Sequence, residues 1–307
     1  MHTGVAVWMG RVLIWPAINY LHEQYMWANF HTHSHYCDGK TGIPELVEEA
    51  RSSKVMSLGL SSHAPLPFER GWAMKRESME AYLRDVTSMK GRFDTVEVYA
   101  GLEIDYVPGR IAPDDFRHQL DFTIGSIHFV DHFPDGEPWE IDNTNAVFMD
   151  GLQRIYKGDV RGAISRYFEL TREMIAGHTP DVTGHLDKIK IQNPDNILFD
   201  ENDGWYRQEI ALTIEALKEA GTIVEVNTRG IYQKKSLTTY PSPWIVDLLF
   251  KNKIPVTLSS DAHHPKDLTR CFAEAATMIS KAGYKSIQVL HEGKWQPYRF
   301  NEHGLLN

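Results

Sequence analysis

Short apolar runs alternate along the chain with stretches of helical periodicity. The runs are rich in β-branched and aliphatic residues and end on polar residues, a pattern typical of buried strands. They predict seven strands, within residues 27–33, 56–63, 96–105, 121–128, 181–185, 222–228 and 254–263.

Helical patterns separate many of these runs. Apolar residues recur at helical spacing from Met79 to Met89, from Ile164 to Ile175, and from Tyr206 to Leu217, where Gly221 is a good stop signal. Strands that alternate with helices predict parallel βαβ units, and about seven units favour a distorted (β/α)7 TIM-like barrel. An open doubly wound sheet remains the alternative, because strand order cannot be read from sequence.

Composition is close to the globular average, but together with length it does not choose between one large α/β barrel and two ordinary domains. The 307 residues are 42% hydrophobic and 24% charged, and no linker or low-complexity tract divides them. We therefore expect one domain at 26–307, preceded by an extension at 1–25. The extension is apolar but broken by Arg11 and Pro16, so it resembles neither a signal peptide nor a membrane span, and a start at Met26 would remove it.

Charge and cysteine content narrow the partners and the compartment. The net charge of −9 argues against a broad nucleic-acid surface, and no membrane contact is expected. Only Cys37 and Cys271 are present, so no disulfide framework exists and the reducing cytoplasm is the expected location. The oligomeric state is left open.

The predicted strands end on histidines and carboxylates. In a β/α barrel, chemistry gathers at the carboxyl ends of the strands, where these side chains would converge. An H-x-H pair on a strand also places both imidazoles on one face. Nitrogen and oxygen donors suit Zn²⁺, Mn²⁺ or Fe²⁺, and carboxylates that can bridge suggest more than one ion. The residues at these ends are His31, His33, His63, Glu103, His128, His185, Asp261 and His263.

Six segments resemble, in order, the motifs of the PHP (polymerase and histidinol phosphatase) family. They read "FHTHSHYCDG", "GLSSHAPL", "GLEIDYVPG", "TIGSIHF", "VTGHLDKIK" and "TLSSDAHHP". The similarity is greatest to the histidinol-phosphate phosphatases of that family. It implies a single-domain (β/α)7 barrel that holds two or three divalent metal ions.

The resemblance also implies a ligand set. Asp38 is the member of this set that depends most on loop spacing, since relatives carry histidine or aspartate there. Four neighbouring residues are not expected to bind metal: Cys37, and His35, His132 and His264, which are expected on the solvated rim. The implied sets are His31, His33, Glu103 and Asp261 for one ion, Glu103, His128 and His185 for a second, and Asp38, His63 and His263 for a third.

The implied activity is hydrolysis of L-histidinol phosphate, a small phosphorylated metabolite, to L-histidinol and phosphate in histidine biosynthesis. A metal-activated hydroxide would attack phosphorus. Arg229, with Arg166 as second candidate, would bind the phosphate by forked hydrogen bonds. Asp187 and His263 are candidates, beside a water, to protonate the leaving alkoxide.

Three alternatives stay open. The same site could hydrolyse nucleotide or oligonucleotide phosphates, although the chain lacks a basic stripe with interleaved aromatic residues. The barrel could instead bind metal without catalysis. An amidohydrolase ranks last, because Glu103 stands where a bridging modified lysine would be expected.

Overall fold

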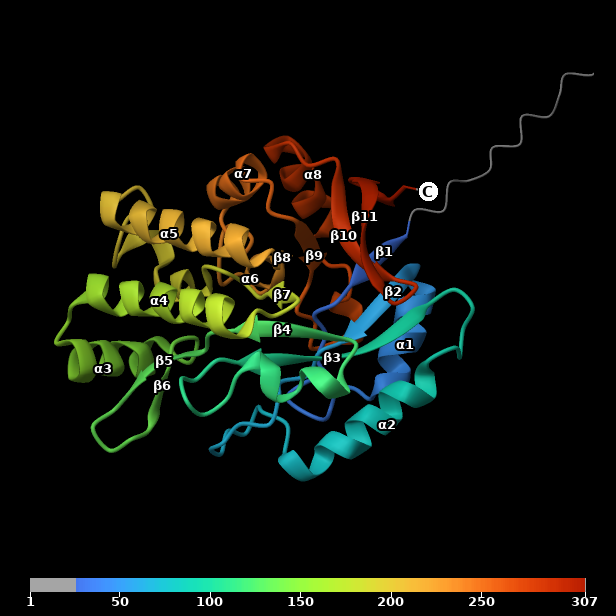
Figure 1. Ribbon diagram of the computed structural model, residues 1–307, viewed down its shortest axis with the longest axis horizontal. Coiled ribbons are helices and arrows are strands. Elements are labelled where there is room, and N and C mark those ends of the chain that lie inside the picture. The colour runs from blue at the N-terminus through green and yellow to red at the C-terminus, as the bar shows by residue number, and fades with distance from the viewer. Residues whose placement is uncertain (1–25, 307) are drawn as a thin grey trace, which may run out of the picture.

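The computed structural model describes residues 26–306, and the extension expected at 1–25 lies outside the described residues. Its centre is a seven-stranded parallel sheet (Figure 1). Each of the seven predicted runs coincides with one of these strands, β2 beginning one residue before its run, so all seven are confirmed. In spatial order they are β1 (Trp27–Asn29), β2 (Val55–Leu60), β3 (Glu97–Asp105), β4 (Phe122–Ser126), β7 (Val182–Thr183), β8 (Ile223–Asn227) and β9 (Val256–Ser259).

The sheet closes on itself just beyond β1 and β9. Thr32 forms a parallel bridge with Ala262, the His33 backbone N–H donates to the Ala262 carbonyl at 2.8 Å, and the Ala262 N–H donates to the His31 carbonyl at 3.1 Å. The barrel prediction is therefore confirmed, and the open sheet is wrong. Closure also brings the first and last motifs of the chain side by side.

Helices pack their apolar faces on the barrel. Tyr82, Tyr167 and Tyr206 are fully buried members of the predicted helical stripes. The expected stop is confirmed, because α5 ends before Gly221, which adopts a left-handed φ of 72°. The helices are α1 (Ile43–Ser52), α2 (Met79–Met89), α3 (Asn145–Tyr156), α4 (Val160–His178), α5 (Gly204–Ala220), α6 (Arg229–Tyr232), α7 (Pro243–Lys251) and α8 (Phe272–Ala282).

Shorter elements occupy the connections. Among residues 26–306, no helix is both long and apolar enough to cross a membrane. An antiparallel hairpin follows β4 directly and consists of β5 (Phe129–His132) and β6 (Pro138–Glu140). The 3-10 helices are η1 (Arg76–Ser78), η2 (Pro113–Asp115), η3 (Arg117–Gln119), η4 (Lys188–Gln192), η5 (Pro194–Asn196) and η6 (Pro265–Asp267).

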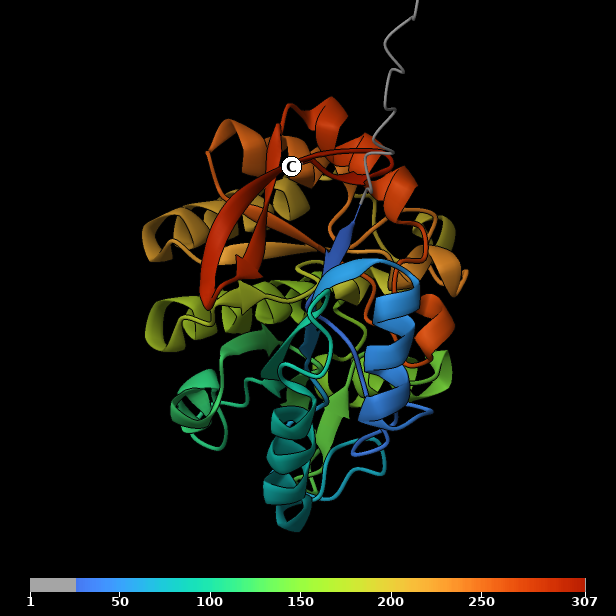
Figure 2. The same ribbon diagram turned by 90° about the vertical axis from the view of Figure 1, so that its right-hand side faces the viewer.

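A C-terminal antiparallel sheet, which the sequence patterns did not predict, covers the amino end of the barrel (Figure 1, Figure 2). It consists of β10 (Ser286–His291), β11 (Lys294–Asn301) and β12 (Gly304–Leu305). Trp295 from β11 lines a cavity there together with Pro180, Thr222 and Pro255, which precede strands, and its ring centroid is 4.8 Å from that of Phe30. The C-terminal sheet therefore lies at the end of the barrel opposite to the histidine-bearing strand ends.

Candidate metal centre

Glu103, on β3, lies at the centre of the histidine cluster. Its side chain is buried, and both of its oxygens face imidazoles. Oε1 is 2.8 Å from His185 Nε2 and 3.5 Å from His128 Nε2. Oε2 is 3.0 Å from His63 Nδ1, 3.1 Å from His31 Nε2 and 3.6 Å from His33 Nε2.

Asp261 extends the cluster from the end of β9. Its Oδ1 is 3.2 Å from His33 Nε2 and 3.8 Å from His31 Nε2. A tetrahedral ion with metal–ligand bonds near 2.1 Å separates neighbouring ligand atoms by about 3.4 Å. The distances of 3.2 and 3.8 Å between these donor atoms therefore agree with ligands that share one metal ion.

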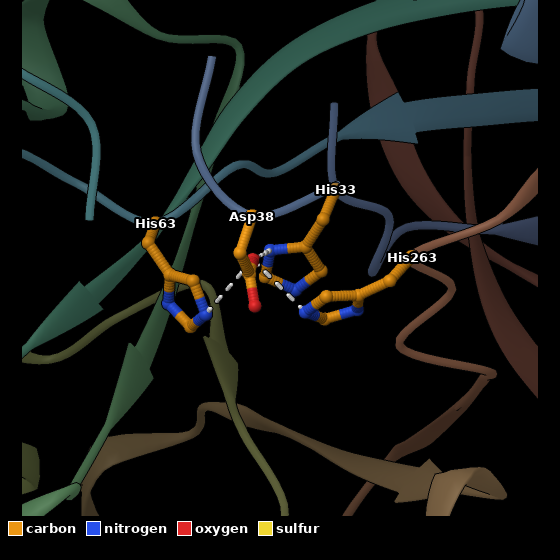
Figure 3. A group of neighbouring side chains, drawn as sticks. All are labelled: His33, Asp38, His63 and His263. Atoms are coloured by element: carbon orange, nitrogen blue, oxygen red, sulfur yellow. Dashed lines mark ion pairs between the residues drawn. The ribbon is translucent and has the colours of Figure 1, made fainter. Parts of the chain in front are cut away.

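Asp38 forms a second focus of the cluster, on the turn that follows β1. Figure 3 shows its carboxylate pointing between three imidazoles, from His33, His63 and His263. Its Oδ1 lies 3.1 Å from His263 Nε2 and 3.9 Å from both His33 Nδ1 and His63 Nε2. The four donor atoms are close enough together to share one ion.

Several buried donor atoms lack a hydrogen-bond partner among the described residues. They are His31 Nε2, His33 Nε2, His63 Nδ1 and Asp38 Oδ1, although buried polar atoms are normally paired. The Nδ1 of His31 is 3.0 Å from both oxygens of Glu225, which orients the ring so that Nε2 faces the Glu103 carboxylate. Burial opposes protonation of His31, but Glu225 and Glu103 raise its pKa well above the usual value, so a cation, either a proton or a metal ion, belongs between Nε2 and Glu103. The residues therefore fit a metal centre.

The charges of the carboxylates support the same conclusion. Burial by itself would raise the pKa of Glu103, but His31, His63 and His128 around it hold that pKa well below its usual range. Burial likewise opposes ionisation of Asp261, yet Arg229 and His31 lower its pKa well below the usual value. Both carboxylates are consequently ionised and able to bind a divalent cation.

The structure brings all nine expected ligand residues to one place. Three groups have donor atoms close enough to share an ion, and His63 belongs to two of them. His185 faces the same Glu103 oxygen as His128. The groups are His33, Asp38, His63 and His263; His31, His33 and Glu103; and His63, Glu103 and His128.

A cavity of about 180 Å³ opens onto the cluster. Arg229, the first residue of α6, lines it, and its Nη1 donates to the Asp261 carbonyl at 2.6 Å and contacts His263 Nδ1. The guanidinium thus lies beside the candidate ligands, as a phosphate-binding group must. Other residues of the wall are Trp72, Glu140, Asp142, Lys188, Lys235 and Tyr240.

Arg166, in contrast, does not line this cavity. Its neighbours Tyr167 and Phe168 occupy the buried face of α4, so its own side chain points outward and pairs with Glu169 at 2.6 Å and Glu173 at 2.9 Å. The expectation that Arg166 binds phosphate at this site was therefore wrong.

Asp187 does not line the cavity either. Its fully buried Oδ2 accepts hydrogen bonds from Lys190 Nζ and from the Ser242 backbone N–H, both at 2.9 Å. The structure therefore does not place Asp187 among the residues that line the cavity, whereas its acid role itself remains a prediction. His263, the other candidate, lines the cavity.

The residues excluded from the ligand set lie beside it. His35 and His132 are exposed, and the His264 side chain accepts a hydrogen bond from the Lys266 backbone N–H. Cys37 is closer to the site, because its Sγ lies 3.5 Å from His33 Nδ1. It belongs to none of the three donor groups.

Sequence reasoning missed the carboxylates that orient the ligands. Asp105 Oδ1 lies 2.9 Å from His128 Nδ1, as the Glu225 carboxylate lies beside His31 Nδ1. Such partners fix the tautomer of a metal-binding imidazole. A signal existed for Asp105, which stands two positions after Glu103 on the same strand and hence on the same face.

Lys188 and Asp142 were not predicted as site residues, because no motif or spacing in the sequence marks them. Lys188 Nζ lies 2.9 Å from Asp142 Oδ2 and 3.2 Å from His128 Nε2 at the cavity wall. Burial opposes its charge, but Asp142, Asp261 and Glu103 raise the pKa of Lys188 above its usual value, so the ammonium stays protonated.

The fold and the site define a class: a parallel (β/α)7 barrel with a multi-histidine, carboxylate-bridged donor cluster at the carboxyl ends of its strands. The chain belongs to the PHP domain family, whose family model matches residues 29–229.

Relatives and solved structures are similar over most of the chain. A Deinococcus radiodurans protein named "Probable histidinol-phosphatase" is 27% identical, covering 87% of this chain and 97% of its own length. The histidinol-phosphatase of Bacillus subtilis is 23% identical, covering 78% of this chain and 94% of its own length.

The histidinol phosphate phosphatase of Lactococcus lactis, solved in complex with zinc, L-histidinol and phosphate, gives a TM-score of 0.63 at 17% identity, covering 92% of this chain and 99% of that one. A structure from Listeria monocytogenes gives 0.71 at 19% identity, with 80% and 99% covered. These structural matches show the same barrel fold.

Proposed function

We propose that this protein is a metal-dependent phosphatase that hydrolyses L-histidinol phosphate to L-histidinol and inorganic phosphate. The observation that carries the proposal is the buried cluster of histidine and carboxylate donors around Glu103, which opens onto a cavity lined by Arg229. The histidinol-phosphatases among its relatives, and the Lactococcus lactis enzyme with L-histidinol and phosphate bound, support the choice of substrate.

The cluster would hold two or three divalent ions, of zinc, manganese or iron. When bound, such ions lower the pKa of a coordinated water to about 7 and neutralise phosphate oxygens, which supplies a nucleophile and charge stabilisation. We assign the ligands as one set of His31, His33, Glu103 and Asp261, a second of Glu103, His128 and His185, and a third of Asp38, His63 and His263.

The chain's own cations would bind the phosphate. Arg229 is held by the Asp261 carbonyl and lies next to His263, so its planar guanidinium is fixed at the edge of the ligand cluster. Lys188 adds a buried, protonated ammonium on the same cavity. A guanidinium and an ammonium together offset most of the charge of a phosphate monoester dianion.

We assign His263 to the ligand set and not to proton transfer. Its Nε2 faces Asp38 at 3.1 Å and its Nδ1 contacts Arg229, so both ring nitrogens are engaged. Burial and the Arg229 charge lower the pKa of His263, which favours the neutral imidazole that binds metal. A water in the cavity then remains as the proton donor to the leaving alkoxide.

The proposal is tested by metal analysis of protein purified without added metal, followed by a phosphate-release panel. We expect bound divalent metal, and release from L-histidinol phosphate that far exceeds release from aryl phosphates and is lost on chelation. Comparable rates on unrelated phosphomonoesters would refute the substrate. Full metal occupancy without turnover of any phosphoester would refute catalysis.

A further inference from the structure

The cavity wall carries an acidic part beside its cationic part. Arg229, Lys188 and Lys235 supply positive charge, whereas Glu140 and Asp142 come from the end of β6 and the segment after it. A phosphate and its metal ions do not need additional carboxylates. The acidic part therefore has some other partner.

Glu140 is the carboxylate without a committed partner. Asp142 is neutralised by Lys188 at 2.9 Å, but the cation nearest to Glu140, Arg70, keeps its Nε 3.8 Å from Oε2, beyond hydrogen-bond distance. Within residues 26–306, no donor makes a hydrogen bond to the Glu140 side chain, which is only 14% exposed.

Arg70 is moreover occupied by other acceptors. It donates to the Glu69 carbonyl at 2.8 Å, to Glu137 Oε2 at 3.2 Å and to the Pro138 carbonyl at 3.3 Å. Its guanidinium also lies over the rings of Phe68 and Phe129, 5.1 and 5.5 Å from their centroids. These contacts hold Arg70 in place and leave Glu140 free to accept a ligand.

Trp72 adds an aromatic surface to the same wall. Its ring stacks on that of Phe129 at an interplanar angle of 15° and meets the edge of His63 at a centroid distance of 4.5 Å. Its Nε1 is buried and has no hydrogen-bond partner among the described residues. An indole and a carboxylate without a hydrogen-bond donor on the wall of one cavity can bind an organic cation, through cation–π attraction and charge-assisted hydrogen bonds.

We propose that Glu140 and Trp72 form the leaving-group subsite, which selects phosphate monoesters whose alcohol carries an ammonium or imidazolium group. The subsite rests on the proposed phosphatase function and deepens it. The phosphate lies on the metal cluster with Arg229 and Lys188, and the cationic end of the alcohol lies against Glu140. A substrate with a second phosphate at that end is repelled.

The test compares Glu140→Gln with the matched control Asp135→Asn in the turn of the same hairpin, where the exposed Asp135 Oδ1 accepts from the Glu137 backbone N–H and does not contact Arg70. Each purified, metal-loaded enzyme is assayed on L-histidinol phosphate and on phenyl phosphate, which has no cationic end. Inhibition by L-histidinol is measured with phenyl phosphate as the substrate. Inhibition by L-histidinol reports binding to the subsite independently of the hydrolysis of L-histidinol phosphate.

We expect Glu140→Gln to lower kcat/KM for L-histidinol phosphate by on the order of 10- to 100-fold, to weaken inhibition by L-histidinol similarly, and to leave phenyl phosphate hydrolysis unchanged. Asp135→Asn should match the wild type on both substrates. Equal losses on both substrates, or undiminished preference for L-histidinol phosphate, overturn the subsite. A wild-type enzyme without that preference refutes the proposed substrate instead, so the two failures are distinguishable.

Discussion

Replacing Glu225 by glutamine tests how a carboxylate that orients His31 contributes to metal affinity, without replacing any proposed ligand. The Glu225 carboxylate is fully buried and accepts from three donors: His31 Nδ1 at 3.0 Å, the His185 backbone N–H at 3.4 Å, and Asn227 Nδ2. Glutamine has one acceptor oxygen and one amide group in the same volume. Its amide N–H must therefore meet one of these donors.

The outcome for His31 follows from the tautomer. If the amide faces Nδ1, the imidazole must present a lone pair there and carry its proton on Nε2, which then cannot bind metal. Because both carboxylate oxygens lie 3.0 Å from Nδ1, the amide group lies near Nδ1 in either orientation; at the Oε1 position it also meets the Asn227 amide, and at the Oε2 position it meets the His185 backbone N–H. Loss of a carboxylate partner of a metal-binding histidine typically costs about 10- to 100-fold in metal affinity, and we expect a loss in that range for Glu225→Gln.

The assay is a competition titration of metal-free protein with Zn²⁺ against a chromophoric chelator. Glu215→Gln, on the exposed face of α5 where Glu215 pairs loosely with Lys218 at 3.8 Å, is the matched control and should bind as the wild type does. Circular dichroism of both variants checks the fold. Wild-type affinity in a folded Glu225→Gln protein would show that the carboxylate does not set the tautomer of His31, and the reasoning would fail.

Three further predictions concern phosphate binding, metal and pH. Arg229→Lys should lower kcat/KM by roughly 10- to 100-fold, since a lysine cannot reproduce the guanidinium fork, whereas Arg166→Lys should match the wild type in steady-state assays. Chelation should lower the melting temperature as well as abolish activity, because metal ligation stabilises the folded state, and an unchanged melting temperature in calorimetry would contradict this. Glu97→Gln should reduce the free energy of unfolding by about 1 kcal/mol at neutral pH, because Glu97 accepts hydrogen bonds from the Tyr99 hydroxyl and the Glu292 backbone N–H. Although burial opposes ionisation, these hydrogen bonds lower the pKa of Glu97. Denaturation across pH should therefore show that the stabilising effect of Glu97 is present above its ordinary pKa of 4.5 and disappears as the pH falls below it.

The central barrel could be predicted because buried parallel strands are continuous apolar runs, and their signal is local. β7 was found even though it is only two residues long, since the polar motif after it marked its end. The C-terminal sheet gave no such signal. β11 consists mostly of exposed and half-buried residues and contains Pro297, so its sequence resembles that of a loop, and its pairing with β10 and β12 makes it a strand.

Eight of the nine candidate ligands could be predicted for a related reason: each stands at the end of a predicted strand, and closure of a barrel brings such ends together. Asp38, on the turn after β1, was expected only from the family resemblance. Nearness to a motif was a poor guide elsewhere. Asp187 follows His185 by two positions, but the chain there enters η4, so Asp187 turns into the protein and Lys188 turns into the cavity. Which of two adjacent residues faces a site depends on the path of the loop, which no periodicity specifies.

The donor cluster and the proposed leaving-group subsite are held by different parts of the fold. The ligands and their orienting carboxylates, such as Glu103 and Glu225, lie on barrel strands or directly after them, where hydrogen bonds to neighbouring strands fix the backbone. Glu140 belongs to the β5–β6 hairpin, which is paired only within itself. The hairpin meets the donor cluster at His128, which directly precedes β5 and whose carbonyl accepts from the Ile141 N–H at 2.9 Å. If Glu140 forms the proposed subsite, a side-chain change at Glu140 that keeps this backbone contact should alter which alcohol is accepted while the donor cluster keeps its geometry.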